Sequence, residues 1–311
     1  MPCPNIVRRD ATSPLTAAEA EAVLALAARS EEADGGAPLS EQFRLSVRAR
    51  DVDGVVHVLA FDEKGPYAAG PALLGYAQSR AGAGGEPPSG ELVVAPDARR
   101  RGVGRALVEA LPEQVRLWSH ARGAAGEGAA RFAEALGLRP VRSLHVMGRS
   151  LRSGPEWGPA ILPADLVARH FEVGRDEDAW VQVNAAAFAH HPEQGSLRRA
   201  DLEQRMAEPW WDPDGFILVV EAADPARIAA FHWTKVDPPE GDVGEVYVVG
   251  VAPAQQGRGL GTAVTVLGLD HLARRGLREV VLYVDEENTA AVHTYSRLGF
   301  EDVEVHRQYA R

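Results

Sequence analysis

The feature that most constrains the fold is a glycine-rich motif that occurs twice in the chain. Its copies read Arg99-Arg100-Arg101-Gly102-Val103-Gly104 and Gln256-Gly257-Arg258-Gly259-Leu260-Gly261, and a Val-Ala-Pro triplet precedes each one. Each copy follows a valine-rich segment typical of a strand and opens a segment with helical spacing of apolar residues. At a helix start, unpaired backbone N–H groups favour an anion, and glycine lets it approach closely. The motif therefore predicts two pyrophosphate-binding loops.

The two copies lie in register along the chain. Val94 and Gly102 correspond to Val251 and Gly259, each of which lies 157 residues later in a chain of 311. That offset is close to half of the chain and lies within the usual size of a domain. We therefore predict two α/β domains, residues 1–152 and residues 160–311, joined by a glycine- and proline-rich linker at 153–159.

Composition excludes several classes of protein. The net charge of −11 disfavours a nucleic acid as the main partner. No apolar run approaches the roughly 18 residues of a membrane span, and the N-terminal segment lacks the apolar stretch of a signal peptide. A single cysteine, Cys3, excludes an intrachain disulfide. We expect a cytoplasmic protein that binds neither nucleic acid nor a membrane.

Other ligand motifs fit this chain poorly. Thr262 stands where a dinucleotide-binding fingerprint needs its third glycine, and no Gly-Lys-Ser/Thr follows either loop as a P-loop requires. The adjacent His190 and His191 have no partner at ligand spacing, so we expect no metal site. The arginine run from Arg99 to Arg101 suits either a solvated helix entrance or local contact with a nucleotide.

Periodicity and turn signals divide the second half into helices and strands. We expect helices over 176–189, 197–207, 260–275 and 288–298, and strands over 216–221, 228–236, 245–251 and 280–284, with a last extended segment from Phe300. Asn288 can cap the last helix, and Gly299 can end it.

A second motif accompanies the glycine loop of the C-terminal half. Asn288-x-x-Ala291-x-x-x-Tyr295-x-x-x-Gly299-Phe300, together with that loop, resembles the GCN5-related N-acetyltransferases (GNAT). The resemblance covers nearly the whole chain, twice. It implies a mixed central sheet with flanking helices in each half, and acetyl-CoA as the co-substrate.

The resemblance also implies where acetyl-CoA binds. In the C-terminal half these residues are Val249, Gly250, Val251, Gln256, Gly257, Arg258, Gly259, Leu260, Gly261, Thr262, Asn288, Thr289, Ala290, Ala291, Val292 and His293. A degenerate CoA site in the N-terminal half would use Leu92, Val93, Val94, Arg100, Arg101, Gly102, Val103, Gly104 and Arg105.

Acetyl transfer needs a group that accepts a proton from the amine and a group that supplies one to the departing thiolate. The phenol of Tyr295 can be the acid, since it is protonated at neutral pH. Glu245 is the candidate base, and it more readily orients the ammonium and relays its proton through water than abstracts it. The alternatives are core packing for the tyrosine and an exposed strand-end carboxylate for the glutamate.

The N-terminal half lacks both groups. The residue 157 positions before Glu245 is Pro88, and aligning Gly137 with Gly299 places Ala133 opposite Tyr295. We therefore predict that the N-terminal half does not catalyse acetyl transfer.

Four segments narrow the resemblance to a tandem branch of the family that acetylates the cysteinyl amine of cysteinyl-glucosaminyl-inositol. These segments are 184–195, 211–215, 231–235 and 244–248. The resemblance implies a thiol-sugar site lined by Glu41, Glu193, Lys235, Glu245 and Tyr283. We expect the protein to be a monomer. Locally, Glu41 also suits the first turn of a helix capped by Ser40. Two alternatives stay open: a tandem acetyltransferase for another small amine or a protein N-terminus, and a non-catalytic acyl-CoA-binding protein.

Overall fold

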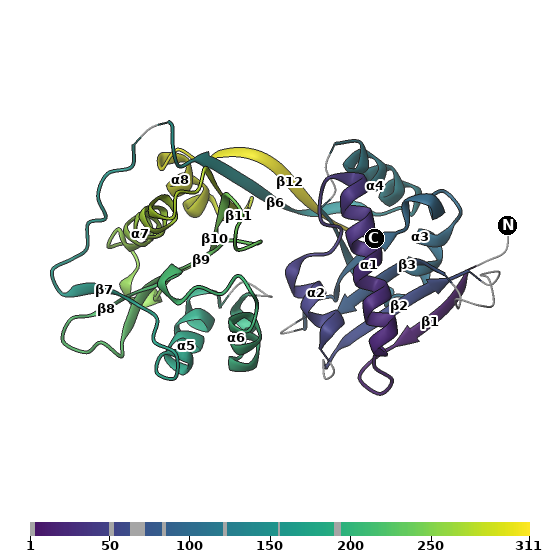
Figure 1. Ribbon diagram of the computed structural model, residues 1–311, viewed down its shortest axis with the longest axis horizontal. Coiled ribbons are helices and arrows are strands. Elements are labelled where there is room, and N and C mark those ends of the chain that lie inside the picture. The colour runs from purple at the N-terminus through teal and green to yellow at the C-terminus, as the bar shows by residue number, and fades with distance from the viewer. Residues whose placement is uncertain are drawn as a thin grey trace. The chain divides into compact units, whose positions relative to one another are not determined.

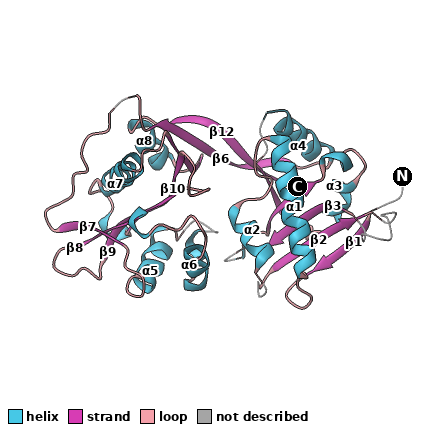
Figure 2. Cartoon of the chain, viewed as in Figure 1, coloured by secondary structure: helices cyan, strands magenta, loops and turns pink. Residues whose placement is uncertain are grey.

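The computed structural model describes residues 4–49, 53–62, 72–82, 85–120, 123–154, 156–189 and 194–311. The chain forms two units (Figure 1): unit 1 contains residues 1–143 and 305–311, and unit 2 contains residues 144–304. Each unit combines a mixed sheet with helices (Figure 2), which confirms the predicted α/β class.

Unit 1 has the strand order β1-β2-β3-β4-β5-β12. Its strands pair antiparallel except β4 and β5, which are parallel and joined through α3. The elements are β1 (Asn5–Arg9), α1 (Ala17–Asp34), α2 (Glu41–Arg48), β2 (Val55–Phe61), β3 (Leu73–Arg80), β4 (Ser89–Val94), α3 (Val103–Glu109), β5 (Arg116–Ser119), α4 (Gly123–Ala135) and β6 (Arg139–Ser150).

Unit 2 has the strand order β6-β11-β10-β9-β8-β7. Among the described strand pairs in this order, β10 and β11 are parallel and the others are antiparallel; α7 connects β10 to β11. The elements are β7 (Leu166–His170), α5 (Glu177–Ala187), α6 (Arg199–Met206), β8 (Phe216–Glu221), β9 (Ile228–Lys235), β10 (Val243–Val251), α7 (Leu260–Arg274), β11 (Glu279–Asp285), α8 (Thr289–Arg297) and β12 (Glu301–Ala310). These bounds confirm the helices and strands predicted for the second half.

Two strands contribute to both units. Residues 144–150 of β6 pair with β11 in unit 2, whereas residues 307–309 of β12 pair with β5 in unit 1. The two units are therefore not divided at 153–159. The boundary at 153–159 is predicted from the sequence repeat. The boundary between residues 143 and 144 follows from packing, in which β6 and β12 each contribute to both units.

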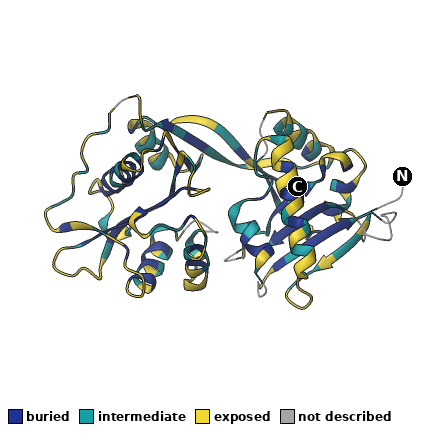
Figure 3. Ribbon diagram, in the orientation of Figure 1, coloured by how far each residue is buried: buried dark blue, intermediate teal, exposed yellow. Residues whose placement is uncertain are grey.

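Apolar side chains cover both faces of the unit 2 sheet. On one face, Val266, Leu269 and Leu272 of α7 pack against strand residues such as Val246. On the other face, α5 and α6 pack on an aromatic core that includes Trp180 and Trp233. Figure 3 shows the burial along these strands, and Figure 1 shows α5 and α6 on one side of the sheet with α7 on the other. The tryptophans of this face are thus core residues.

A buried histidine couples β9 to α7. His232 is fully buried, and its Nδ1–H donates to the Val264 carbonyl over 2.9 Å. Gly268, one turn further along α7, makes room for the imidazole: a Cβ there would lie 2.0 Å from its Cε1. Burial lowers the pKa of His232 to about 4.

We expect this histidine to make unit 2 less stable in acid. An unfolded histidine binds its proton near pH 6.5 and the folded one only near pH 4, so the free energy of unfolding falls as pH drops through this window. The expected loss is about 2 kcal/mol by pH 5. Urea unfolding followed by tryptophan fluorescence measures it, because five of the six tryptophans lie in unit 2.

The matched variants are His232→Asn and His170→Asn. The first should flatten the dependence of unfolding free energy on pH between 6.5 and 4, whereas the second, at an exposed histidine of β7, should not. An equally steep dependence in His232→Asn would show that other groups cause the acid sensitivity. His57 of unit 1, whose burial also lowers its pKa to about 4, adds a slope of the same sign.

Candidate active site

The second glycine motif forms a tight turn between β10 and α7. β10 ends at Val251, a 3-10 turn covers Pro253–Gln255, and α7 begins at Leu260. Gly257 (φ 76°) and Gly259 (φ 78°) have left-handed backbone conformations that would strain a side chain. A Cβ at Gly261 would meet nothing within 4 Å. The N-terminus of α7, with its unpaired N–H groups, is therefore accessible.

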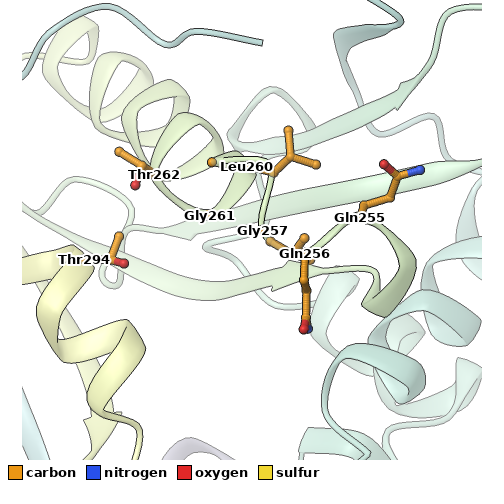
Figure 4. A pocket seen from close by; sticks show the side chains of 9 residues that line it. Gln255, Gln256, Gly257, Leu260, Gly261, Thr262 and Thr294 are labelled. Atoms are coloured by element: carbon orange, nitrogen blue, oxygen red, sulfur yellow. The ribbon is translucent and has the colours of Figure 1, made fainter. Parts of the chain in front are cut away.

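A pocket of about 210 Å³ lies at this turn (Figure 4). Its lining includes seven of the predicted CoA-binding residues: Val251, Gln256, Gly257, Gly259, Leu260, Gly261 and Thr262. It also includes Gln255 and Thr294, which the sequence prediction omitted. Thr294 follows the predicted segment 288–293 directly, so helical spacing from Ala290 or Ala291 was the signal that could have found it. Arg258 instead pairs with Asp165 over 2.6 Å.

The strands β10 and β11 stay paired over only part of their length. Their parallel pairing runs from Val243 to Val246 on β10, although β10 continues to Val251. A bulge at Tyr247 shifts the register with β9 at the point where this pairing ends. The predicted CoA-binding residues Val249 to Val251 thus follow the point where the two strands part.

The helix α8 carries the candidate acid. Asn288 caps it by accepting a hydrogen bond from the Ala291 N–H over 3.2 Å, so Thr289 to His293 form its first turns. Tyr295 packs edge-on against Phe300, with ring centroids 5.8 Å apart. Burial raises the pKa of Tyr295 to about 12, which keeps the phenol protonated at neutral pH.

Three of the predicted substrate residues share one face of the unit 2 sheet. Glu245 lies opposite Lys235 of β9 and opposite Val281 of β11. Tyr283 follows Val281 by two residues and is 43% exposed. Because side chains alternate along a strand and opposed residues share a face, Lys235, Glu245 and Tyr283 project from the same side.

Lys235 lies in an aromatic environment that the sequence did not reveal. It is 6% exposed, and its Nζ lies 4.8 Å from the ring centroid of Trp210 and 5.2 Å from that of Tyr247. The Asp237 carboxylate lies 3.6 Å from the same Nζ. We call this surrounding of Trp210, Tyr247 and Asp237 the Lys235 cage. Its members come from three separate segments, so no local pattern predicts it.

The predicted substrate residue Glu193 lies outside the described residues, as do His190 and His191. The following residue is well anchored: Asn184 of α5 donates to the Gln194 carbonyl over 2.8 Å, and the Gln194 amide donates to the Asn184 side chain over 2.9 Å.

The structure places Glu41 as the first residue of α2 in unit 1. Ser40 is the N-cap, and its backbone N–H donates to the buried carboxylate of Glu91 over 2.7 Å. The local prediction of a helix start is confirmed. A role for Glu41 with substrate stays a prediction.

The glycine loop of unit 1 repeats the backbone of its counterpart with a less suitable sequence. Gly102 (φ 86°) matches Gly259, but Arg100 (φ 63°) takes the left-handed conformation that Gly257 takes in unit 2. Arg99 forms a bidentate ion pair with Asp34 and donates to the Val94 carbonyl. The helix that follows, α3, has seven residues, against 15 in α7.

An aromatic ring fills the position beside the unit 1 loop that is open in unit 2. A Cβ on Gly104 would lie 3.1 Å from Phe132 of α4, whereas a Cβ on Gly261 meets nothing within 4 Å. By the 162-residue offset that aligns Gly137 with Gly299, Phe132 corresponds to Thr294. One substitution, a ring for a hydroxyl, thus distinguishes the two loops at this point.

Across the described residues, no group of three or more His, Cys, Asp or Glu side chains is arranged to hold a metal ion. In the same part of the chain, every helix is too short or too polar to cross a bilayer.

The sequence matches the profile of the acetyltransferase (GNAT) family twice, over residues 23–138 and 183–300. Curated relatives match the chain over nearly its whole length. A mycothiol acetyltransferase of Streptomyces griseus is 47% identical over 95% of this chain and 92% of its own. A mycothiol acetyltransferase of Rhodococcus erythropolis is 43% identical over 96% of this chain and 98% of its own.

Solved structures share the tandem fold. A tandem GNAT protein from the clavulanic acid biosynthesis pathway superimposes with a TM-score of 0.69 at 19% identity, over 99% of this chain and 98% of its own. A GCN5-related N-acetyltransferase from Sphaerobacter thermophilus superimposes with a TM-score of 0.61 at 26% identity, over 98% and 95% of the two chains.

Proposed function

The chain belongs to the acetyltransferase (GNAT) family and, within it, to the mycothiol acetyltransferases, and from this premise we propose how its two halves contribute. It is an acetyl-CoA-dependent N-acetyltransferase. We propose, from the resemblance to relatives named mycothiol acetyltransferase, that its reaction acetylates the cysteinyl amine of cysteinyl-glucosaminyl-inositol, giving mycothiol and CoA, the last step of mycothiol biosynthesis. We assign the chemistry to the C-terminal half, residues 160–311, and a degenerate role to residues 1–152.

The pocket at the start of α7 is the observation that supports this assignment. We place the pyrophosphate of acetyl-CoA on the backbone N–H groups of residues 256–262, where the positive end of a 15-residue helix adds attraction. The pantetheine arm then follows Val249 to Val251, where β10 continues past its pairing with β11 and offers strand-edge backbone groups. Residues 288–293, in and before the first turns of α8, complete the cofactor site.

Tyr295 is the proposed acid. A phenol with a pKa of about 12 is a weaker acid than a CoA thiol, whose pKa is about 8.5. It therefore donates a hydrogen bond that stabilises the departing thiolate before any proton is transferred. Glu245 orients the ammonium of the substrate, and a water molecule beside it relays the proton away.

The remaining proposed contacts bind the thiol sugar. Lys235, Glu245 and Tyr283 project from one face of the sheet, and Glu41 and Glu193 complete the predicted set. A polyhydroxylated substrate with one ammonium suits a site with carboxylates, an amine and a phenol.

The glycine loop of the N-terminal half is not expected to support turnover of its own. Replacing Arg101 of its loop by alanine should leave kcat and both KM values within a few-fold, because Pro88 and Ala133 stand where the C-terminal half has Glu245 and Tyr295. Steady-state kinetics with varied acetyl-CoA and varied amine test this. A loss of 100-fold or more in kcat would instead place an essential step in unit 1.

The deciding experiment measures CoA release by the purified protein with several amines at equal concentration. Cysteinyl-glucosaminyl-inositol is compared with glucosamine, an aminoglycoside and a short peptide. A rate confined to the cysteinyl sugar is expected. Turnover of another amine alone would keep the fold and the mechanism and discard the substrate, and acetyl-CoA binding without any turnover would indicate a non-catalytic protein. Cytoplasmic location and a monomeric state stay predictions from the sequence.

A further inference from the structure

The Lys235 cage connects to a second buried cation that no step above uses. Arg205, on the last turn of α6, is 5% exposed. Its Nε donates to the Tyr247 hydroxyl over 2.8 Å, and its Nη1 donates to the Asp201 carbonyl over 2.8 Å. The Lys235 ammonium thus lies over the Tyr247 ring, and the Arg205 guanidinium donates a hydrogen bond to the hydroxyl of the same ring.

Regular strand pairing does not fix the orientation of the Tyr247 ring. Tyr247 is the extra residue of the β10 bulge, where pairing with β9 is out of step. Its ring is fixed by neighbours instead: the centroid lies 5.2 Å from that of Trp210 and 5.1 Å from that of Trp233. The Arg205 hydrogen bond adds the directional contact, because a charged donor restrains the hydroxyl more strongly than a neutral one.

The position of this ring matters for Lys235. A lysine side chain is long and flexible, and ordering it in one conformation costs conformational entropy. If the folded protein already orders this side chain, substrate binding does not have to bear that cost. An ammonium over two aromatic faces, with a carboxylate 3.6 Å away, is held before substrate arrives. Lys235 and Glu245 are opposed across β9 and β10, so this placement also sets where the amine lies relative to the proposed base.

We propose that Arg205 and Tyr247 are positioning residues for the acetyl acceptor: their hydrogen bond fixes the Tyr247 ring, the ring fixes the Lys235 ammonium, and that ammonium contacts the hydroxyl groups of the amino sugar. The proposal rests on the substrate contact assigned to Lys235 above. It concerns binding of the amine and leaves binding of acetyl-CoA untouched, because the pocket at the start of α7 includes none of these side chains.

The test compares KM values for cysteinyl-glucosaminyl-inositol and for acetyl-CoA in four variants. Tyr247→Phe keeps the ring and removes the hydroxyl, Arg205→Met removes the donor, and the double variant removes both; Lys235→Met removes the ammonium. Each of the first two should raise the KM for the amine roughly threefold to tenfold, the range for releasing one ordered side chain, with the KM for acetyl-CoA within twofold. The double variant should match the larger single effect, because each change breaks the same hydrogen bond between Arg205 and the Tyr247 hydroxyl.

Two controls separate positioning from folding. Arg199→Met removes an exposed arginine from the same helix and should change neither KM value. Arg205→Lys keeps the charge and should recover part of the lost affinity for the amine. Thermal unfolding of every variant shows which ones are folded at the assay temperature, and Tyr247→Phe, the mildest change, decides the matter if Arg205→Met does not fold.

The possible outcomes distinguish a wrong assignment of the Lys235–substrate contact from a wrong positioning role for Arg205 and Tyr247. An unchanged amine KM in Lys235→Met overturns both the Lys235 contact and this inference. A raised amine KM in Lys235→Met but an unchanged one in Tyr247→Phe overturns the inference alone. Equal increases in the KM values of both substrates, or additive effects in the double variant, overturn it as well.

Discussion

Replacing Tyr295 by phenylalanine is expected to lower kcat by about 10² to 10⁴, the range for loss of a general acid. The ring that packs against Phe300 is retained, so the helix α8 keeps its packing and only the hydroxyl is lost. Acetyl-CoA affinity should change little, because the pyrophosphate and pantetheine contacts that we propose lie on other residues. Steady-state kinetics and a direct titration with acetyl-CoA measure the two effects separately.

The pH dependence of the wild type gives an independent check on Tyr295. Because burial raises the pKa of Tyr295 to about 12, its ionisation should not reduce kcat at any pH up to about 10. A control variant, Tyr309→Phe, alters a buried tyrosine of unit 1 outside the proposed site and should leave kcat unchanged. An unaltered kcat in Tyr295→Phe would remove the acid role.

Replacing Thr294 by phenylalanine is expected to raise the Kd for acetyl-CoA roughly 10-fold to 100-fold, a free-energy cost of about 1.4–2.8 kcal/mol. Unit 1 supplies the reason. There the corresponding Phe132 lies against Gly104, whereas Thr294 lines an open pocket beside Gly261. A ring at position 294 would fill the space that we assign to the cofactor. Isothermal titration of the variant with acetyl-CoA measures the loss.

The matched control is Thr294→Val, which keeps the volume and removes only the hydroxyl that donates to the Ala290 carbonyl. It should bind acetyl-CoA within a few-fold of the wild type. The reverse change, Phe132→Thr, should open the unit 1 loop and increase any acetyl-CoA binding there. If Thr294→Phe bound acetyl-CoA like the wild type, the cofactor would not pass between α7 and α8.

The local features of this site could be predicted from the sequence because they depend on neighbouring residues. The glycines at 257 and 259 adopt the left-handed conformations that the motif requires, and Asn288 caps α8 as its side chain suggests. Lys235 was found only by resemblance. The rings of Trp210 and Tyr247 around it are not predicted, because that contact depends on a bulge and on the turn that follows α6, which is remote in sequence from β9.

The division between the halves was also beyond the reach of the sequence. A glycine- and proline-rich stretch at 153–159 is a sound local signal for a connection. Strand pairing is not local, and nothing in the composition of β6 or β12 reveals which sheet each segment joins. The repeat offset changes from 157 at the glycine loops to 162 at Gly137 and Gly299, so the second copy has five more residues between these points, a stretch in which α7 is longer than α3.

The exchanged strands constrain the order in which the two units can fold during synthesis. Residues 305–311 belong to the sheet of unit 1, yet the ribosome adds them only after all of unit 2. Unit 1 therefore cannot finish folding while it emerges, in contrast to the usual N-terminal-first order of multidomain chains. Until then the free edge of β5 is exposed to pairing with other nascent chains. For the same reason, a fragment cut at 160 would lack the β6 segment that covers β11, so separate expression of the halves requires cuts that respect the exchange.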